Sequence, residues 1–298
     1  MKLYLAAIYT NSVSLTGNVF RRFTPVEQAA RLGVKHILDS YHYIGKPTAV
    51  EAIRRDKTKV FLDSGAFSAF TAGVTIDLDE YCAYIKRNAD IIEVASVLDA
   101  IGDPYATWQN QVAMEKQGVQ ALPCYHYGED PRYLQHYVAN YPYITLGGMV
   151  PINKEQLGYW LDDIWDKYLT TPAGLPKVKV HGFGLTRVSL MERYPWYSVD
   201  SSSWVQSAGN GGIMIPGLGT MFVSLDSPQR KEAGRHLDTL PPLQRQVFLD
   251  AIAARGFDVE RLKTTYLARW SFNMQTFNEL DQTDAIPKPF KLNQPTFF

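Results

Sequence analysis

The chain has 298 residues, of which 46% are hydrophobic, so it can bury a large core. Lys and Arg number 30, as do Asp and Glu, so net charge gives no indication of a nucleic-acid, membrane or acidic partner. Cys82 and Cys124 are the only cysteines, which fits a reducing compartment and excludes a zinc site made of several cysteines.

The first ten residues, MKLYLAAIYT, lack the apolar length of a signal peptide and are more typical of a first strand. No stretch approaches the ~18 apolar residues of a membrane span. We therefore expect a soluble cytoplasmic protein with no membrane partner.

Apolar β-rich runs then alternate with helical patterns. Strands are predicted at 3–8, 34–39, 59–63, 91–98, 119–125, 143–147, 177–183 and 197–201. Helices are predicted at 24–32, 47–56, 77–88, 104–117, 131–139, 154–168 and 186–193. Helix-start signals support two of them, Thr24-Pro25 with Glu27 and Asp103-Pro104.

Eight strands with seven intervening helices predict an α/β fold, a (β/α)8 TIM barrel. A doubly wound open sheet is the alternative, but no dinucleotide-type Gly-rich turn follows the first strand. We interpret residues 1–298 as a single barrel domain with its strands at about 3–202. Residues 203–298 then supply closing helices at 241–256 and 258–270, a hairpin and a tail, without a core of their own and without a zinc subdomain.

Polar residues recur where the predicted strands end, which is where barrels carry their chemistry. They are His42, Asp63, Asp99, His126, Gly147, Gly148, His181 and Asp200. A single Asp after a strand is more often a helix N-cap than a catalyst, so the prediction rests on their coincidence. If Asp63 and Asp200 converge, they form the carboxylate pair that glycosidic-bond chemistry needs.

Three blocks in order resemble the tRNA-guanine transglycosylase superfamily: VFLDSGAFS, YITLGGMV and YSVDSSSWVQSAGNGG. The resemblance covers about half of the chain. The runs LDAIGDP, PCYHYGED and HGFGLT are more similar to the phage and bacterial branch of this superfamily, the 7-deazaguanine DNA transglycosylases. The resemblance implies a (β/α)8 barrel that exchanges guanine in DNA for a 7-deazaguanine such as 7-cyano-7-deazaguanine, with no cofactor.

The resemblance also implies roles for the two acids. Asp200 matches the nucleophile that attacks C1′ and expels guanine, and Asp63 matches the general acid/base. Loss of a base creates oxocarbenium character that one carboxylate can trap, while a second with a different pKa moves protons. By analogy with retaining glycosidases, we expect their carboxyl groups to lie ~5–5.5 Å apart.

Pocket residues follow from the same match. Phe67 and His181 would stack on opposite faces of the purine, and Asp99 would accept from its N1–H and amine. Gly147, Gly148 and Met149 would present backbone groups to O6 or to the 7-substituent. An ordinary core phenylalanine and a capping or ion-paired aspartate remain the alternatives for Phe67 and Asp99.

Two departures from the tRNA enzymes bear on the substrate. CYHYGED stands where those enzymes have Gln-Gly, so His126 or Tyr127 would take over purine recognition. No cysteine follows Cys124, so their Cys/His zinc site is missing. The missing site favours double-stranded DNA over tRNA as the substrate, and it favours a monomer. A partner protein is left open. If the gene belongs to a phage, we expect the protein in the host cytoplasm.

The target base must leave its stack to reach a barrel pocket, which requires a grip on the polymer. The candidate phosphate contacts are Arg21, Arg22, Lys46, Arg187 and Arg193. A metal-dependent barrel hydrolase with His42, His126, His181 and Asp200 as ligands is a second hypothesis, although no early His-x-His is present. A non-catalytic purine-binding barrel is a third.

Overall fold

The computed structural model describes residues 1–13, 15, 22–150, 152–185, 187–281 and 289–292. The chain divides into two compact units. The first comprises residues 1–13, 36–201 and 282–298, and the second comprises residues 14–35 and 202–281.

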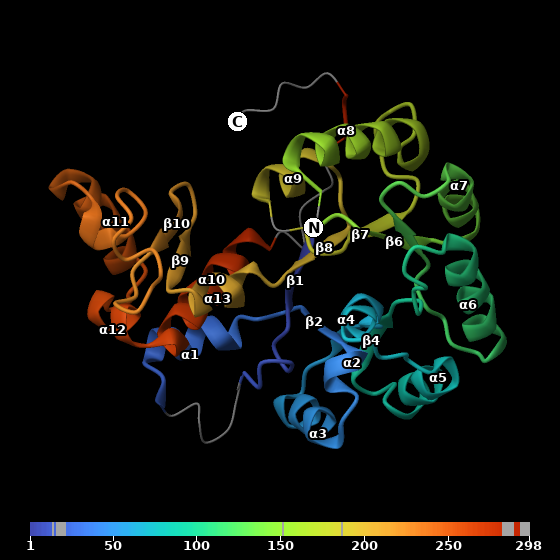
Figure 1. Cartoon of the computed structure of the whole chain (residues 1–298), viewed down its shortest axis with the longest axis horizontal. Helices are drawn as coiled ribbons and strands as arrows, with labels where there is room; N and C mark the ends of the chain where they lie inside the picture. Colours follow the sequence, from blue (N-terminus) through green and yellow to red (C-terminus); the bar gives the residue numbers. More distant parts are fainter. Residues whose placement is uncertain (14, 16–21, 151, 186, 282–288, 293–298) are drawn as a thin grey trace. The chain divides into compact units, whose positions relative to one another are not determined.

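The first unit is built on a curled, all-parallel sheet of eight strands (Figure 1). They are β1 (Lys2–Ala6), β2 (Ile37–Ser40), β3 (Val60–Asp63), β4 (Ile92–Ala95), β5 (Cys124–His126), β6 (Tyr143–Gly147), β7 (Lys179–Gly182) and β8 (Ser198–Ser201). Each overlaps a predicted strand, so the eight predicted strands are confirmed, although most of their bounds differ from the predicted ones. We call the side on which these strands end the C-terminal edge.

The strand order is β4-β3-β2-β1-β8-β7-β6-β5, so sequence neighbours pair and the first strand pairs with the last, as in TIM-like barrels. Strands β4 and β5 form no continuous ladder. A single parallel bridge joins Ser96 to Leu122, with amide-to-carbonyl bonds of 2.8 Å from Leu122 to Ala95 and 2.9 Å from Val97 to Leu122. The α/β class is confirmed, and the sheet is a half-barrel with TIM-like connectivity, not a closed barrel.

The helices of the first unit match most of the expected ones. They are α2 (Tyr41–Ile44), α3 (Pro47–Asp56), α4 (Ala66–Thr71), α5 (Leu78–Arg87), α6 (Pro104–Lys116), α7 (Pro131–Asn140), α8 (Lys154–Ile164), continued by the π-turns of Trp165–Leu169, and α9 (Val188–Arg193). Asp77, Asp103 and Asp130 cap α5, α6 and α7 by accepting from first-turn amides. The short helices α2 and α4 were not predicted, and both begin at the C-terminal edge.

The second unit contains α1 (Pro25–Leu32), α10 (Ser203–Gly209), α11 (Pro242–Ala254), α12 (Val259–Thr264), α13 (Tyr266–Leu280) and the antiparallel pair β9 (Gly212–Ile215) and β10 (Gly219–Phe222). Its apolar cluster includes Ile213, Ile252 and Phe272, all buried. This core differs from the expectation that 203–298 has none. Helix α1, expected among the barrel helices, also belongs to this unit, where Arg31 donates to Ser271 at 3.0 Å.

No described helix of either unit is both long enough and apolar enough to cross a bilayer.

Candidate active site

Asp63 is the last residue of β3, and three hydrogen bonds surround its carboxyl group. The register of β2 and β3 places Ser40 opposite Asp63, and the Ser40 hydroxyl donates to Oδ2 at 2.8 Å. The Gly65 amide also donates to Oδ2 at 3.0 Å, and the Ser96 hydroxyl reaches Oδ1 at 3.5 Å. These donors are all uncharged, so none of the described hydrogen bonds to Asp63 comes from a cation.

The pKa of Asp63 is raised to about 6, chiefly because its carboxyl group is buried. The negative charges of Asp99 and Asp200 raise it further, whereas the bonds from Ser40 and Gly65 lower it. A carboxyl group with this pKa exchanges its proton near neutral pH, as a general acid/base must. The influence of Asp200 supports the expected convergence of the two acids, and the ~5–5.5 Å separation stays a prediction.

Gly65 makes the turn after β3 possible. Its φ is 75°, and a Cβ there would lie 2.7 Å from the Cβ of His42 and 3.1 Å from that of Ser40. Only glycine fits both this backbone conformation and this space. His42 on α2 therefore packs against the turn that carries the amide bond to Asp63.

Asp200 lies in β8, is 6% exposed, and accepts both of its hydrogen bonds on Oδ1. The Gly184 amide donates at 2.8 Å from the turn after β7, and His181 Nε2 lies 3.3 Å away. Unlike Asp63, Asp200 has both of its polar contacts on a single oxygen.

His181 lies beneath Asp200 and not on a ligand face. Its side chain is fully buried, with ring centroids 4.6 Å from Phe61, 4.7 Å from Phe183 and 5.9 Å from Tyr4. Burial lowers the pKa of His181 even though Asp200 raises it, so the imidazole is neutral. Because aromatic rings cover this side chain, the predicted stacking on a purine does not fit it.

His126 ends β5 and lies between two carboxylates. Its Nδ1 is 3.0 Å from Glu129 Oε1, and its Nε2 is 3.6 Å from Asp99 Oδ2. Burial opposes protonation, but Cys124 and these carboxylates favour it, and the pKa of His126 is raised as a result. Asp99 Oδ1 is buried and has no hydrogen-bond partner among the residues that the structure describes, which is unusual for a carboxylate oxygen.

Of the described residues, Asp99, Cys124 and His126 form one group with the spacing of a metal site, their ligand atoms lying within 4.8 Å of one another. Cys124 Sγ is 3.5 Å from His126 Nε2, and burial raises the pKa of this thiol to about 11. A Cβ at Gly147 would lie 3.0 Å from that Nε2 and 3.1 Å from that Sγ, so glycine keeps this space open. This set differs from the predicted metal ligands. Among those predicted ligands, His181 and Asp200 contact each other.

The other pocket residues lie along the same edge. Phe67, in the first turn of α4, is 66% exposed, so its ring is free to meet a ligand. Gly148 has a φ of 71° and approaches the Tyr127 amide, where a Cβ would be 3.1 Å away. Met149 is buried, so it can offer only its backbone to a ligand.

The predicted phosphate contacts separate into different environments. Lys46 and Arg187 are exposed at the N-caps of α3 and α9. Arg193 makes two 2.8 Å hydrogen bonds to Asp162 and is therefore occupied. Arg22 is exposed in the second unit, and Arg21 lies outside the described residues.

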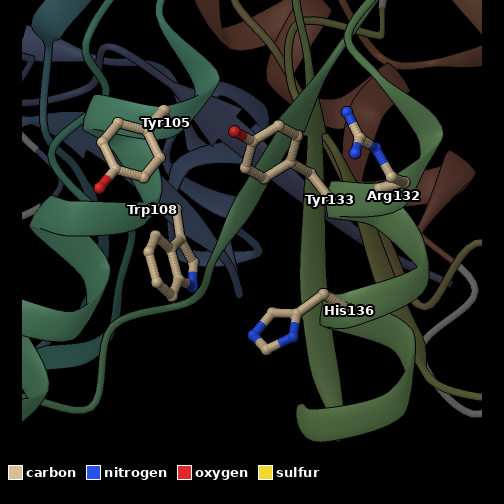
Figure 2. Close-up of a pocket in the computed structure, with 5 residues that line it drawn as sticks. All are labelled: Tyr105, Trp108, Arg132, Tyr133 and His136. Atoms are coloured by element: carbon tan, nitrogen blue, oxygen red, sulfur yellow. The ribbon is translucent and has the colours of Figure 1, made fainter.

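Hollows are also present among the described residues. One of about 300 Å³ lies between α6 and α7, where Tyr105 and Trp108 face Arg132, Tyr133 and His136 (Figure 2). Its aromatic residues are spaced i, i+3 on each helix, so the sequence carries a signal for this aromatic surface. A smaller one of about 60 Å³ is lined by Met149, Gly184 and Arg187, among others.

Sequence reasoning missed four contributors: Ser40, Ser96, Gly184 and Glu129. Ser40 and Ser96 reach Asp63 through strand pairing, which the sequence does not display. Glu129 carried a signal, because it lies three residues after His126 in a tight turn.

Compared with known proteins, the sequence matches no family model and no curated protein.

Proposed function

We propose that this protein is a base-exchange transglycosylase that replaces guanine in DNA with a 7-deazaguanine through a covalent intermediate on Asp200. The observation that carries the proposal is the pair of acids at the C-terminal edge in opposite environments. Asp63, with a pKa raised to about 6, can hold a proton, whereas Asp200 is contacted on one oxygen by the Gly184 amide and the His181 imidazole. Retaining glycosyl transfer needs this division of labour.

The proposed reaction has two symmetrical halves. Asp200 attacks C1′ as the bond from C1′ to the base breaks, and Asp63 gives its proton to the departing guanine. The incoming 7-deazaguanine then loses a proton to Asp63 and displaces Asp200 from C1′. Configuration is retained because C1′ is inverted twice.

The surroundings of Asp99 support recognition of a guanine-like edge. Its unpartnered Oδ1 can accept from N1–H and the exocyclic amine. His126 Nε2 lies 3.6 Å from Asp99 Oδ2, and an N–H on this nitrogen can donate to O6 beside that carboxylate. An acceptor beside a donor complements the edge of guanine and opposes that of adenine, and the exposed Phe67 ring can stack on the purine.

Incubation with labelled 7-deazaguanine and either duplex DNA or tRNA tests the proposal. We expect label in DNA, and expect Asp200→Asn to abolish it and Asp63→Asn to lower it strongly. Asp77→Asn is the matched control, since Asp77 is exposed and caps α5 by accepting from the Glu80 amide. Incorporation into tRNA alone would overturn the DNA assignment, and full activity of both variants would overturn the mechanism.

A metal-dependent hydrolase is the second candidate, favoured by the spacing of Asp99, Cys124 and His126. Carboxylate, thiolate and imidazole ligands suit Zn²⁺, with Glu129 on the far nitrogen of His126 as an orienting partner. Metal content after purification separates the candidates. One equivalent of zinc that is lost in Cys124→Ser and kept in Cys82→Ser would favour the hydrolase.

A further inference from the structure

A chain of hydrogen bonds runs from Asp200 into the interior of the sheet. His181 Nε2 lies 3.3 Å from Asp200 Oδ1, and His181 Nδ1 lies 2.7 Å from the Ser198 hydroxyl. That hydroxyl lies 2.6 Å from the Tyr143 hydroxyl. The register of β7 and β8 pairs His181 with Ser198, so the backbone itself sets this contact.

The direction of every bond in the chain follows from counting protons. A carboxylate only accepts, so His181 Nε2 carries the hydrogen that faces Asp200. The imidazole is neutral in its buried setting, so Nδ1 is an acceptor and Ser198 must donate to it. Ser198 has then used its only proton, so the Tyr143 hydroxyl donates to the serine oxygen.

We infer that Tyr143, Ser198 and His181 are positioning residues that hold one oxygen of Asp200 and leave the other to react. Gly184 N–H and His181 Nε2–H both bind Oδ1. No other described residue donates to this carboxylate, so Oδ2 is the oxygen that attacks C1′. The choice of Oδ2 rests on the proposed function, whereas the tautomer of His181 does not.

We call the hydrogen-bonded Tyr143, Ser198 and His181 the relay. The relay keeps its protons during the reaction. When the bond from Oδ2 to C1′ forms, the electron pair of the bond between C1′ and the base leaves with the base, which takes the proton of Asp63. Oδ1 becomes the carbonyl oxygen of an ester and still accepts from Gly184 and His181. In the second half the ester bond breaks and its electron pair returns to Oδ2.

Substitution of the relay tests the inference through a spectroscopic signal that does not depend on activity. In protein labelled with ¹⁵N-histidine, we expect a protonated Nε2 and a bare Nδ1 for His181. Ser198→Ala should mix the two tautomers and lower kcat for base exchange about tenfold, with little change in KM for the base. Tyr143→Phe should lower kcat less, because the serine proton remains.

Tyr194→Phe is the matched control, since this buried hydroxyl makes a 2.7 Å bond to Asp162 on other elements. It should leave both the tautomer and kcat unchanged. Ser198→Thr keeps the hydroxyl and should therefore show the wild-type tautomer signal of His181. If Ser198→Ala does not fold, this variant tests the relay in its place.

A wild-type His181 protonated on Nδ1 would overturn the relay, as would an unchanged tautomer and kcat in Ser198→Ala. Absence of base exchange in the wild type, with the expected tautomer present, would overturn the proposed function and the role of Oδ2 but leave the hydrogen-bond order standing.

Discussion

The two halves of the C-terminal edge treat a carboxyl group in opposite ways. On the β2–β4 side, the Asp63 carboxyl group accepts hydrogen bonds from hydroxyls and one amide. Burial and the negative charges of two other acids raise its pKa to about 6. On the β7–β8 side, Asp200 receives two N–H groups on a single oxygen. Identical side chains thus acquire different chemistry from their neighbours.

The difference arises from what each strand places beside the acid. Serine from β2 and from the segment after β4 can donate or accept, so the surroundings of Asp63 tolerate both protonation states. The amide of Gly184 and the imidazole of His181 both contact one oxygen of Asp200, so that oxygen is held in place. Each of the following predictions tests one side of this contrast.

Asp200→Asn is expected to have the largest effect, at least about a 10³-fold loss of exchange, because the amide cannot form the ester. Denaturing electrophoresis of reactions with labelled DNA should show a protein–DNA adduct in the wild type. Asp63→Asn should still form the adduct slowly. An adduct in Asp200→Asn would contradict the assignment of the nucleophile.

Gly65→Ala should distort the Asp63 side alone. The new Cβ meets His42 and Ser40 at a φ of 75°, so we expect about a 10- to 100-fold loss of activity and a lower Tm. Gly73→Ala is the matched control, with a φ of 67° and no atom within 4 Å. It carries the backbone strain without the clash, and equal activity losses in the two variants would refute the packing argument.

Ser40→Ala should shift the pH profile of guanine release. The wild-type rate should fall as pH rises through about 6, because departure of the base needs protonated Asp63. Loss of the Ser40 bond raises the pKa of Asp63, so this limb should move to higher pH by about half a unit or more. Ser96→Ala removes a longer bond of 3.5 Å and should move it less.

Asp63→Asn should stabilise the fold at alkaline pH while it lowers activity. The folded pKa of Asp63, about 6, exceeds its unfolded value near 3.8, so its stabilising contribution is complete below 3.8 and is lost as pH rises through 6. Asparagine does not ionise, so the Tm of the variant should exceed that of wild type by about a few degrees at pH 8. The gain should shrink at pH 4.5, and a gain independent of pH would have another cause.

Substitution of the surface cations should have the smallest effects. Lys46→Ala and Arg187→Ala should each weaken DNA binding and reduce the salt dependence of the affinity by about one ion. Arg193→Ala should leave the salt dependence unchanged, because Asp162 already occupies this guanidinium. Fluorescence anisotropy across a salt series measures all three.

The sequence predicted the strands and most helices of the first unit because apolar runs and caps such as Asp103 and Asp130 mark them clearly. It did not predict α2 and α4, which are too short to show a helical period. The second core was missed because Ile213, Ile252 and Phe272 come from separate segments whose packing no local pattern displays.

Within the site, the positions of Asp63 and Asp200 at strand ends followed from the sequence. The partners of each acid did not, because register decides them: Ser40 lies beside Asp63, and His181 beside Ser198. The burial of His181 also depends on which way its strand faces. A one-residue change of register would have turned the ring to the other face of the sheet.

The single bridge between Ser96 and Leu122 has a consequence for motion. Between β4 and β5, in the part of the chain that the structure describes, the sheet is joined by the backbone bonds of that bridge, and the contact of His126 with Asp99 adds a side-chain link. Ser96 also contacts Asp63 and accepts from the Ser64 amide, so separation there would loosen the shell of the acid. Amide hydrogen exchange at Val97 and Leu122 therefore reports on how often Asp63 loses its fixed surroundings.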